Sequence, residues 1–302
     1  MVFETFSAGK LLISSEYVVL DGALALALPT VWGQELACDE KEDGKSILHW
    51  EAYHQNKHWL SIRIDYKSWQ ILETNIPASA EFIVRTLKNI QKLSPKKLQG
   101  DSSYFIKTHL QFPADYGLGS SSTLMNNLAR WSGIDAFELN ALSLGGSGYD
   151  IAVAQENSPI LYQLEAGKRS IRRVDFNPEF RDELLFVHLN QKQDSREGIA
   201  MYRQKEKTTA LIDFFSQLTE ELLKTTDIDR FSELISQHEA RLSAFLGIAT
   251  VKQKFFADYP CFIKSLGAWG GDFVLTRKTE NYHQYFQERG FSTFFSWEEI
   301  IQ

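Results

Sequence analysis

The segment ADYGLGSSSTLMNN, residues 114–127, places the tightest limit on the fold, because two glycines and three serines stand directly ahead of an apolar stretch. The alternating residues before it predict a strand that Pro113 ends, and the residues after it predict a helix that Gly133 closes. A glycine-rich backbone entering a helix N-terminus exposes unpaired N–H groups and the positive end of the helix dipole, which together bind phosphate. The segment predicts a phosphate-binding loop, although a plain loop with serine N-caps explains this stretch equally well.

An activating lysine has to come from elsewhere, because none follows the second glycine as in the G-x-x-x-x-G-K-[ST] loop. SAGKLLISSEY places Lys10 between a glycine and a predicted strand, and GGSGYDIAVA places Asp150 after a glycine-rich turn. Such a carboxylate can orient or deprotonate a hydroxyl. Taken singly, Lys10 is explained by a surface charge and Asp150 by a turn or N-cap. With a third glycine-rich stretch, KSLGAWGGDFVLT at 264–276, they favour phosphoryl transfer, which depends mostly on positioning and charge stabilisation.

Composition excludes several classes of protein. A chain of 302 residues, 43% hydrophobic, is long enough for one large or two ordinary globular domains. The net charge of -7 argues against a nucleic-acid surface. Cys38 and Cys261 lie too far apart for a zinc ribbon, so we expect buried free thiols. Glu4, Lys10 and Glu16 interrupt the N-terminal apolar run, so we expect neither a signal peptide nor a membrane span, and a cytoplasmic protein.

Periodicity predicts antiparallel α+β layers rather than a parallel βαβ sheet. The helix predicted at 78–93 has Ser79 as its expected N-cap. No pair of the seven histidines lies four residues apart on a predicted helix, and we expect none to bind a metal. A soft domain boundary falls near Asn177 and Pro178, giving domains 1–178 and 179–302. Strands are predicted within 1–40, 58–72, 103–112, 183–191, 272–278 and 292–297, and further helices at 123–133, 209–225, 229–248 and 251–259.

The motifs SAGKLLISSEYVVLDGALALALPT, PADYGLGSSS, GSGYDIAVA and LGAWGGDF, in this order, resemble those of the GHMP kinase superfamily, named for galactokinase, homoserine kinase, mevalonate kinase and phosphomevalonate kinase. The second is the most specific, with Pro113, three residues, and then Gly-Leu-Gly-Ser-Ser. The first and third look most like the mevalonate and phosphomevalonate kinase branch. The resemblance spans essentially the whole chain and implies an N-terminal domain like ribosomal protein S5 domain 2, a C-terminal ferredoxin-like domain and an active site between them.

The resemblance also implies an activity. It points to a kinase that uses ATP and Mg2+ to phosphorylate a hydroxyl or a phosphate, with mevalonate or phosphomevalonate of isoprenoid biosynthesis as the favoured acceptor. The expected partner is therefore a small-molecule substrate, with neither nucleic acid nor membrane, and a homodimer is allowed. The related diphosphomevalonate decarboxylase is disfavoured, because its first motif looks different from the Ala-Gly-Lys found here.

Carried over by position, the resemblance implies roles for individual residues. Asp150 and Lys10 would be catalytic, and residues 267–272 would buttress the phosphate loop. Ser195 and Arg196 follow a predicted strand, where Arg196 could hold a carboxylate or phosphate in a bidentate manner; a solvated charged loop is the alternative. The residues expected on the ATP phosphates are Gly117, Leu118, Gly119, Ser120, Ser121 (also on the magnesium side) and Ser122. Those expected at the substrate are Glu16, Tyr17, Ser147, Gly148, Ser195 and Arg196.

Four departures from the family pattern leave a second hypothesis open. Ser15 stands where Gly usually precedes Glu, Ala8 replaces a Pro, and Trp269 occupies a glycine position. A large indole there should reshape the pocket or move the loop. The family's magnesium-binding Glu also has only a poor candidate here, Glu138. The alternative is therefore a catalytically weak relative that binds nucleotide or metabolite as a sensor or partner protein.

Overall fold

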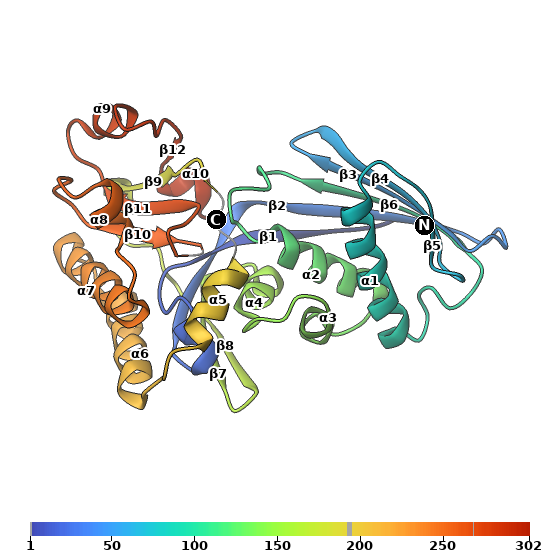
Figure 1. Ribbon diagram of the computed structural model, residues 1–302, viewed down its shortest axis with the longest axis horizontal. Helices are drawn as coiled ribbons and strands as arrows, with labels where there is room; N and C mark the ends of the chain where they lie inside the picture. Colours follow the sequence, from blue (N-terminus) through green and yellow to red (C-terminus); the bar gives the residue numbers. More distant parts are fainter. Residues whose placement is uncertain (1, 192–194, 268) are drawn as a thin grey trace. The chain divides into compact units, whose positions relative to one another are not determined.

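The computed structural model describes residues 2–191, 195–267 and 269–302 (Figure 1). The chain forms two compact units. Unit 1 comprises the residues up to Gly9 with residues 32–114 and 119–157, and unit 2 comprises residues 10–31, 115–118 and 158–302. The boundary expected between 178 and 179 stays a prediction. The units divide the chain differently, because two early segments pack with the C-terminal residues.

Unit 1 is built on a mixed sheet with the strand order β5-β4-β3-β6-β2, and β1 also pairs with β2. Most pairs are antiparallel, but β3 and β6 run parallel from Leu48 opposite Tyr104 to His54 opposite Leu110. The expectation of purely antiparallel layers is wrong at this pair, because α1 crosses over and returns the chain in the direction of β3. The elements with residues in unit 1 are β1 (Phe3–Leu12), β2 (Ala25–Lys41), β3 (Ile47–His54), β4 (Lys57–Asp65), β5 (Gln70–Thr74), α1 (Pro77–Leu93), β6 (Ser103–Leu110), α2 (Ser120–Ser132), α3 (Ala136–Ser143) and α4 (Tyr149–Glu156).

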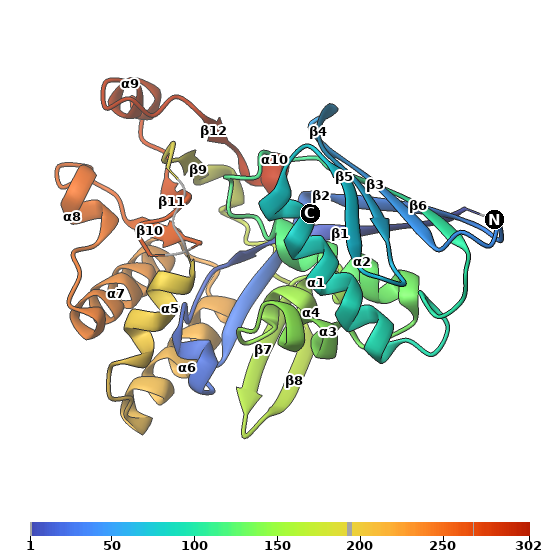
Figure 2. The same ribbon diagram turned by 45° about the vertical axis from the view of Figure 1, so that its right-hand side comes forward.

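One face of this sheet carries the core of unit 1, under α1, α2 and α3 (Figure 2). Leu87 of α1 and Met125 of α2 are fully buried in the same cluster as Trp50 of β3. Helix α1 begins at Pro77 with Ile76 as its N-cap, so the predicted cap at Ser79 is wrong. Proline suits the first helical position, because it lacks the N–H that would be unpaired there and its φ is already helical.

Unit 2 holds a second sheet, antiparallel throughout, with the order β10-β11-β9-β12 among the described residues. The first residues of β2 pair with β7. The strands predicted within 183–191, 272–278 and 292–297 and the helices at 209–225, 229–248 and 251–259 are confirmed, with shorter bounds. The remaining elements are η1 (Val18–Asp21), β7 (Ile160–Glu165), β8 (Lys168–Arg173), η2 (Arg181–Glu183), β9 (Leu184–His188), α5 (Ser195–Arg203), α6 (Thr209–Lys224), α7 (Ile228–Leu246), α8 (Val251–Phe255), β10 (Ile263–Leu266), β11 (Phe273–Arg277), α9 (Tyr282–Gln287), β12 (Phe294–Phe295) and α10 (Trp297–Ile300).

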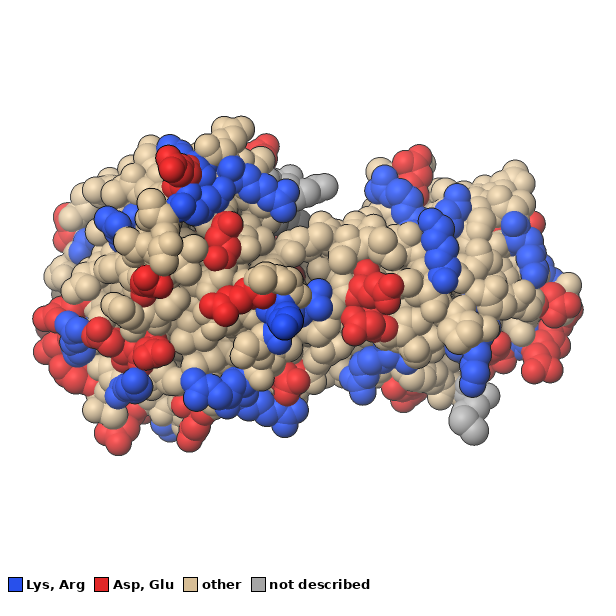
Figure 3. Space-filling model, turned by 90° about the horizontal axis from the view of Figure 1, so that it is seen from below, with Lys and Arg blue, Asp and Glu red and all other residues tan. Residues whose placement is uncertain are grey.

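The surface shows no dominant charge on the face drawn in Figure 3, where basic and acidic side chains are interspersed. Within the described ranges, no helix is both long enough and apolar enough to cross a membrane. Both cysteines are free thiols, as predicted. Cys38 is buried, and burial raises its pKa to about 12, whereas Cys261 is only partly buried.

Candidate active site

Lys10, in strand β1, contacts the glycine loop that the sequence predicts to bind phosphate. Its ammonium group donates a hydrogen bond to the carbonyl oxygen of Gly117 at 3.1 Å. Its backbone N–H donates to the carbonyl of Leu118 at 2.9 Å, so strand β1 and the loop are joined along the main chain as well. Lys10 is partly buried, and the bonded oxygen belongs to the loop itself. The lysine that the loop lacks in sequence is therefore supplied in space by β1.

The third glycine-rich stretch supports this loop through Asp272, which is buried. A Cβ added at Gly117 would lie 1.9 Å from the Asp272 carboxylate, and one at Gly267 would lie 2.5 Å from it. Both glycines also have left-handed φ angles, +66° and +87°. Each backbone can approach the carboxylate only without a side chain. This contact supports the predicted role of residues 267–272 as a buttress.

The serines of the second motif form the first turn of α2 rather than part of the loop. Gly119 is the N-cap, with φ of 87°, and it brings no side chain to cap the helix. Ser122 is buried and donates its hydroxyl to the Gly119 carbonyl at 2.8 Å, whereas Ser121 is exposed. The thirteen-residue helix therefore begins with N–H groups that no N-cap side chain satisfies, the arrangement that binds phosphate.

Asp150 is the second residue of another helix, α4, in unit 1. The N-cap is Gly148, with φ of 86°, so the alternative reading of Asp150 as an N-cap does not hold. Its Oδ1 accepts the backbone N–H of Ile151 at 3.0 Å, and the side chain is partly buried. Ser147, just ahead of the cap, is buried. Ser147 and Gly148 thus shape the turn that presents Asp150.

The donor set of unit 1 suits magnesium in a particular way. Ser121 and Asp150 offer hard oxygen ligands at the starts of α2 and α4, two helices that pack against each other. Glu138 is exposed on α3, and its backbone N–H is capped by Asp135, as expected for a poor ligand. No cluster of three His, Cys, Asp or Glu side chains in the described ranges could hold a metal. Magnesium commonly needs only one or two carboxylates alongside substrate phosphates, so these residues fit it.

The first motif forms a strained turn with a buried carboxylate in unit 2. Ser15 and Tyr17 have positive φ angles of 65° and 63°, although neither is glycine. Glu16, between them, pairs with Lys264 and lies 3.0 Å from Nε2 of His238. Burial alone would raise the pKa of Glu16, but the Lys264 ammonium and His238 outweigh it and lower that pKa to about 2. Burial alone would lower the pKa of Lys264, but the Glu16 and Glu239 carboxylates outweigh it and raise that pKa.

Trp269 is buried in the core of unit 2. Its ring packs in a cluster with Tyr17 and Tyr202, and its backbone N–H donates to the Tyr17 hydroxyl at 2.8 Å. Tyr17 stacks on Tyr202 at 5.9 Å. The indole expected to reshape this region is therefore accommodated in the buried cluster that contains Tyr17.

Ser195 and Arg196 are the first residues of α5, but their side chains lie outside the part of the chain that the structure describes. The same helix approaches the first motif through Gly198, where a Cβ would lie 2.2 Å from the Tyr17 hydroxyl. The substrate roles expected of Ser195 and Arg196 therefore stay predictions.

Sequence reasoning missed three residues beside Glu16. Lys264 belongs to the third motif but was read only as the start of a glycine stretch. His238 and Glu239 lie on α7 and carry no motif. The one available signal was their burial, since charged residues on the apolar side of a predicted helix need partners.

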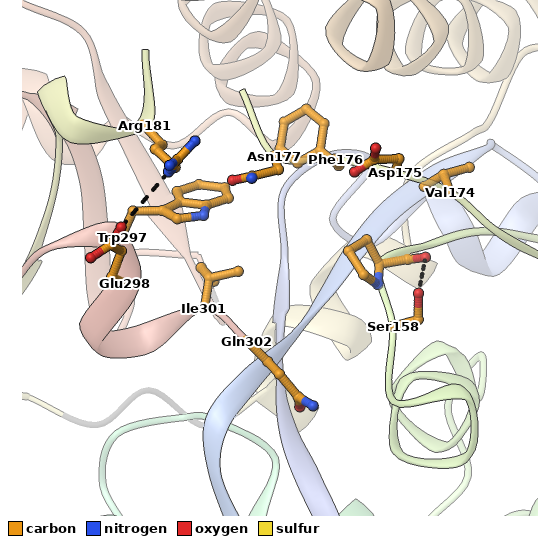
Figure 4. A pocket seen from close by; sticks show the side chains of 11 residues that line it. Ser158, Val174, Asp175, Phe176, Asn177, Arg181, Trp297, Glu298, Ile301 and Gln302 are labelled. Atoms are coloured by element: carbon orange, nitrogen blue, oxygen red, sulfur yellow. Dashed lines mark hydrogen bonds and ion pairs between the residues drawn. The ribbon is translucent and has the colours of Figure 1, made fainter. Parts of the chain in front are cut away.

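A separate cavity of about 520 Å³ lies in unit 2 and contains none of the predicted site residues (Figure 4). Trp297 and Arg181 stand on one side of it, and Arg181 lies 4.0 Å from Glu298. Ser158 and Asp175 line it from other segments. Asp175 is an exposed carboxylate outside the motifs, which makes it a suitable control position.

Comparison with known proteins identifies the fold. No family model and no curated protein matches the sequence. Streptococcus pneumoniae phosphomevalonate kinase, solved with phosphomevalonate and AMPPNP, is 15% identical, and the match covers 97% of this chain and 99% of that one with a TM-score of 0.68. Methanococcus jannaschii mevalonate kinase is 16% identical, with 98% and 96% covered and a TM-score of 0.64. Lactococcus lactis galactokinase, solved with galactose, is 12% identical, with 98% and 92% covered and a TM-score of 0.64.

This chain has the GHMP kinase fold. The predicted α+β class and the GHMP resemblance are confirmed by matches that span nearly the whole of both chains. At identities of 12–16% the likeness concerns the fold, and the chemistry has to be argued from the residues.

Proposed function

We propose that this chain is an ATP-dependent small-molecule kinase of the GHMP type, which transfers the γ-phosphoryl group to a hydroxyl or a phosphate. The observation that carries the proposal is the hydrogen bond from the Lys10 ammonium to the Gly117 carbonyl, on a loop that Asp272 buttresses. A cation held at a glycine loop that leads into an uncapped helix N-terminus suits a transferring phosphoryl group.

Each element has its own task in this reaction. The first N–H groups of α2 bind ATP phosphates, with the exposed Ser121 hydroxyl beside them. The Lys10 ammonium offsets negative charge on the phosphoryl group during transfer. Asp150 orients the acceptor and takes its proton while the acceptor oxygen bonds to the γ-phosphorus and the bond to ADP breaks. ADP and the phosphorylated acceptor are the products.

Magnesium, when bound with ATP, supplies charge neutralisation across the phosphates. Ser121 is the residue we assign to its side of the site, and Asp150 is the carboxylate in the first turn of α4, which packs against α2. The remaining ligands would be phosphate oxygens and water.

Mevalonate and phosphomevalonate are the acceptors we favour. The first and third motifs, residues 7–30 and 146–154, look most like those of this branch, which supports the choice. A phosphomevalonate kinase solved with phosphomevalonate and a mevalonate kinase also share the fold over nearly their full length. These acceptors would place the chain in the synthesis of isoprenoid precursors.

The test is ADP release by the purified chain with ATP, Mg2+ and a panel of mevalonate, phosphomevalonate and other GHMP acceptors. Asp150→Asn should lower turnover by about 100-fold or more, because general-base catalysis is lost. Lys10→Met should lower it by a comparable factor. The matched controls are Asp175→Asn in the cavity of Figure 4 and Lys45→Met in an exposed turn, which should retain wild-type turnover. Absence of ADP release across the panel would contradict the proposal.

A second candidate is a catalytically weak GHMP-fold protein that binds nucleotide or metabolite. The exposed position of Glu138 favours it, because α3 brings no inward-facing carboxylate to complete a metal shell. The hydrogen bond of Lys10 to the loop favours the kinase. Calorimetry that finds ATP binding while no acceptor on the panel is phosphorylated would select the binding protein.

A further inference from the structure

Four ionisable side chains of unit 2 form a closed cluster in the protein interior, which we call the buried charge cluster: Glu16, His238, Glu239 and Lys264. The side chains of Lys264 and His238 are fully buried, and those of the two glutamates are 5% exposed. The Lys264 ammonium pairs with Glu16 and lies 3.2 Å from Glu239. The imidazole of His238 lies 3.0 Å from Glu16 through Nε2 and 3.4 Å from Glu239 through Nδ1. Each basic side chain therefore faces both carboxylates.

Such a cluster is an expensive way to stabilise a fold. Burying charged groups carries a large desolvation penalty in free energy. Well-packed apolar side chains of the same volume often stabilise a fold as much or more, so a buried ion pair is weak evidence for a stabilising role. Three of its atoms, Glu16 Oε2, Glu239 Oε1 and His238 Nδ1, also make no hydrogen bond among the described residues. The geometry that the cluster imposes on its surroundings offers a better explanation.

One side of the cluster holds the turn of the first motif. The backbone N–H of Ser15 donates to Nε2 of His238 at 2.9 Å. Ser15 and Tyr17 both have left-handed φ angles, which non-glycine residues adopt only where the surroundings enforce them. Glu16, between them, is held by its carboxylate. The cluster therefore holds Ser15 and Glu16, the two residues directly before Tyr17.

The other side holds the strand that leads into the third glycine loop. The Lys264 ammonium donates to the Ser265 carbonyl at 2.7 Å, and the Ser265 N–H donates to Glu239 Oε2 at 3.1 Å. The Ser265 hydroxyl accepts the Gly270 N–H at 3.3 Å. Tyr17 connects the turn directly to this loop, because its hydroxyl accepts the Trp269 N–H. The turn and the loop are therefore set by the same four side chains.

We propose that the buried charge cluster positions the acceptor side of the kinase site by fixing the turn of the first motif, with Glu16 as its inward anchor and Tyr17 as its buried contact with Trp269. This inference rests on the proposed kinase function. His238, Glu239 and Lys264 are positioning residues, which act through residues 15–17 and 267–272. The acceptor is a small anionic alcohol or phosphomonoester, and the Glu16 carboxylate, already engaged by Lys264 and His238, makes no direct bond to it.

The first experiment compares two replacements of His238 in the full chain. In His238→Gln, a side-chain amide oxygen reaches the place of Nε2 and can still accept the Ser15 N–H. In His238→Leu, a side chain of similar size cannot. We expect His238→Leu to raise the acceptor KM about tenfold or more and the ATP KM by a smaller factor, transmitted through the third glycine loop, and His238→Gln to restore most of both losses. Equal effects of the two variants, or equal changes in both KM values, would overturn the proposal.

A cycle of Glu16→Gln, Lys264→Met and the double variant tests the role of Glu16. Each single variant leaves a buried charge without its main partner, whereas the double variant removes both. The double variant should therefore keep an acceptor kcat/KM no lower than that of the worse single variant. Multiplying losses would show that Glu16 binds the acceptor directly and would overturn the assignment.

A second readout needs no catalysis. With 5-fluorotryptophan incorporated, the 19F resonance of Trp269 can be assigned by its disappearance in Trp269→Phe. His238→Leu should shift this resonance, and His238→Gln should leave it near the wild-type position, because only the first releases the turn that holds Tyr17 against Trp269. An unmoved resonance in His238→Leu overturns the positioning claim. If the wild type fails to phosphorylate any acceptor, the kinase proposal fails alone, and the 19F result decides whether the cluster sets the turn.

Discussion

The phosphate loop and the first-motif turn share a left-handed backbone conformation, but the loop adopts it at glycines and the turn at residues with side chains. In the loop, Gly117 and Gly119 adopt left-handed φ angles of 66° and 87°. In the turn, Ser15 and Tyr17 adopt nearly the same conformation, at 65° and 63°, with side chains attached. Glycine takes this conformation at no steric cost, whereas other residues need contacts that enforce it.

The difference shows which residues fix the backbone conformation at each site. Gly117 leaves room for the Asp272 carboxylate, and Gly119 begins α2 without an N-cap side chain. The turn instead relies on His238 and Lys264, far away in the sequence, to hold a strained backbone. We infer that glycine lets the loop adopt this backbone conformation without enforced strain, whereas the turn requires the packing of unit 2 to hold its strained residues. Four predictions test this contrast, from the largest expected effect to the smallest.

Gly117→Ala should be the most damaging change. The added Cβ would lie 1.9 Å from the buried Asp272 carboxylate, in a strained φ, which predicts a loss of roughly 4 kcal/mol in the free energy of unfolding. Gly133→Ala is the matched control, because its φ of +67° is the same and nothing lies within 4 Å of the added carbon. It should cost only about 1 kcal/mol of backbone strain in the same urea titration. Equal losses would show that the contact with Asp272 does not matter.

Acid should weaken the turn through Glu16. Its pKa falls from 4.5 to about 2 in the folded protein, so its contribution is present above pH 4.5 and is lost as pH falls toward 2. The shift corresponds to about 3 kcal/mol. The gap in the free energy of unfolding between wild type and Glu16→Gln should therefore shrink by most of that amount from pH 6 to pH 2. A gap that is constant with pH would contradict the paired carboxylate.

Two substitutions of Ser15 distinguish the effect of backbone strain on stability from the effect of a hydrogen bond. Its hydroxyl donates to the Leu24 carbonyl at 2.6 Å in a buried position. Ser15→Ala keeps the strain and loses the bond, which should cost about 1 to 2 kcal/mol. Ser15→Gly loses the same bond but relieves the strain, so chemical denaturation should find it close to wild type. If the glycine variant were the less stable of the two, backbone strain at this turn would be excluded.

The two neighbouring serines of α2 should differ in kind. Ser122→Ala removes a buried hydrogen bond to Gly119 and should cost about 1 kcal/mol of folding stability. Ser121→Ala changes an exposed side chain, so thermal unfolding should be unchanged while the KM for MgATP rises. A rise in that KM for Ser122→Ala alone would reverse the assignment of the two hydroxyls.

The local features of the site could be predicted from the sequence. Residues 117–121 spell a motif whose glycines and helix start are determined by neighbours in the chain, and Gly133 closes α2 as expected. The sequence offered Lys10 as the activating lysine but did not show that its ammonium would bond to the Gly117 carbonyl, and its catalytic role stays a prediction. The GHMP fold followed from the order of four short motifs, each of which encodes a backbone conformation rather than a surface.

The long-range features could not be predicted. Nothing near Glu16 in the sequence shows that its carboxylate turns inward, because its partners lie on α7 and β10. Trp269 looked like an obstruction in a glycine loop, but its indole packs in a buried cluster with Tyr17 and Tyr202. The parallel pairing of β3 with β6 escaped notice for the same reason, since alternation within a strand does not specify the direction of its neighbour.

The most direct measurement is 31P NMR of the purified chain with ATP, Mg2+ and phosphomevalonate or mevalonate. We expect a new phosphate signal, a diphosphate from phosphomevalonate or a monoester from mevalonate, that grows one for one with ADP and is nearly absent with Asp150→Asn. Spectra in which ATP stays intact, or yields only ADP and inorganic phosphate, would contradict this expectation.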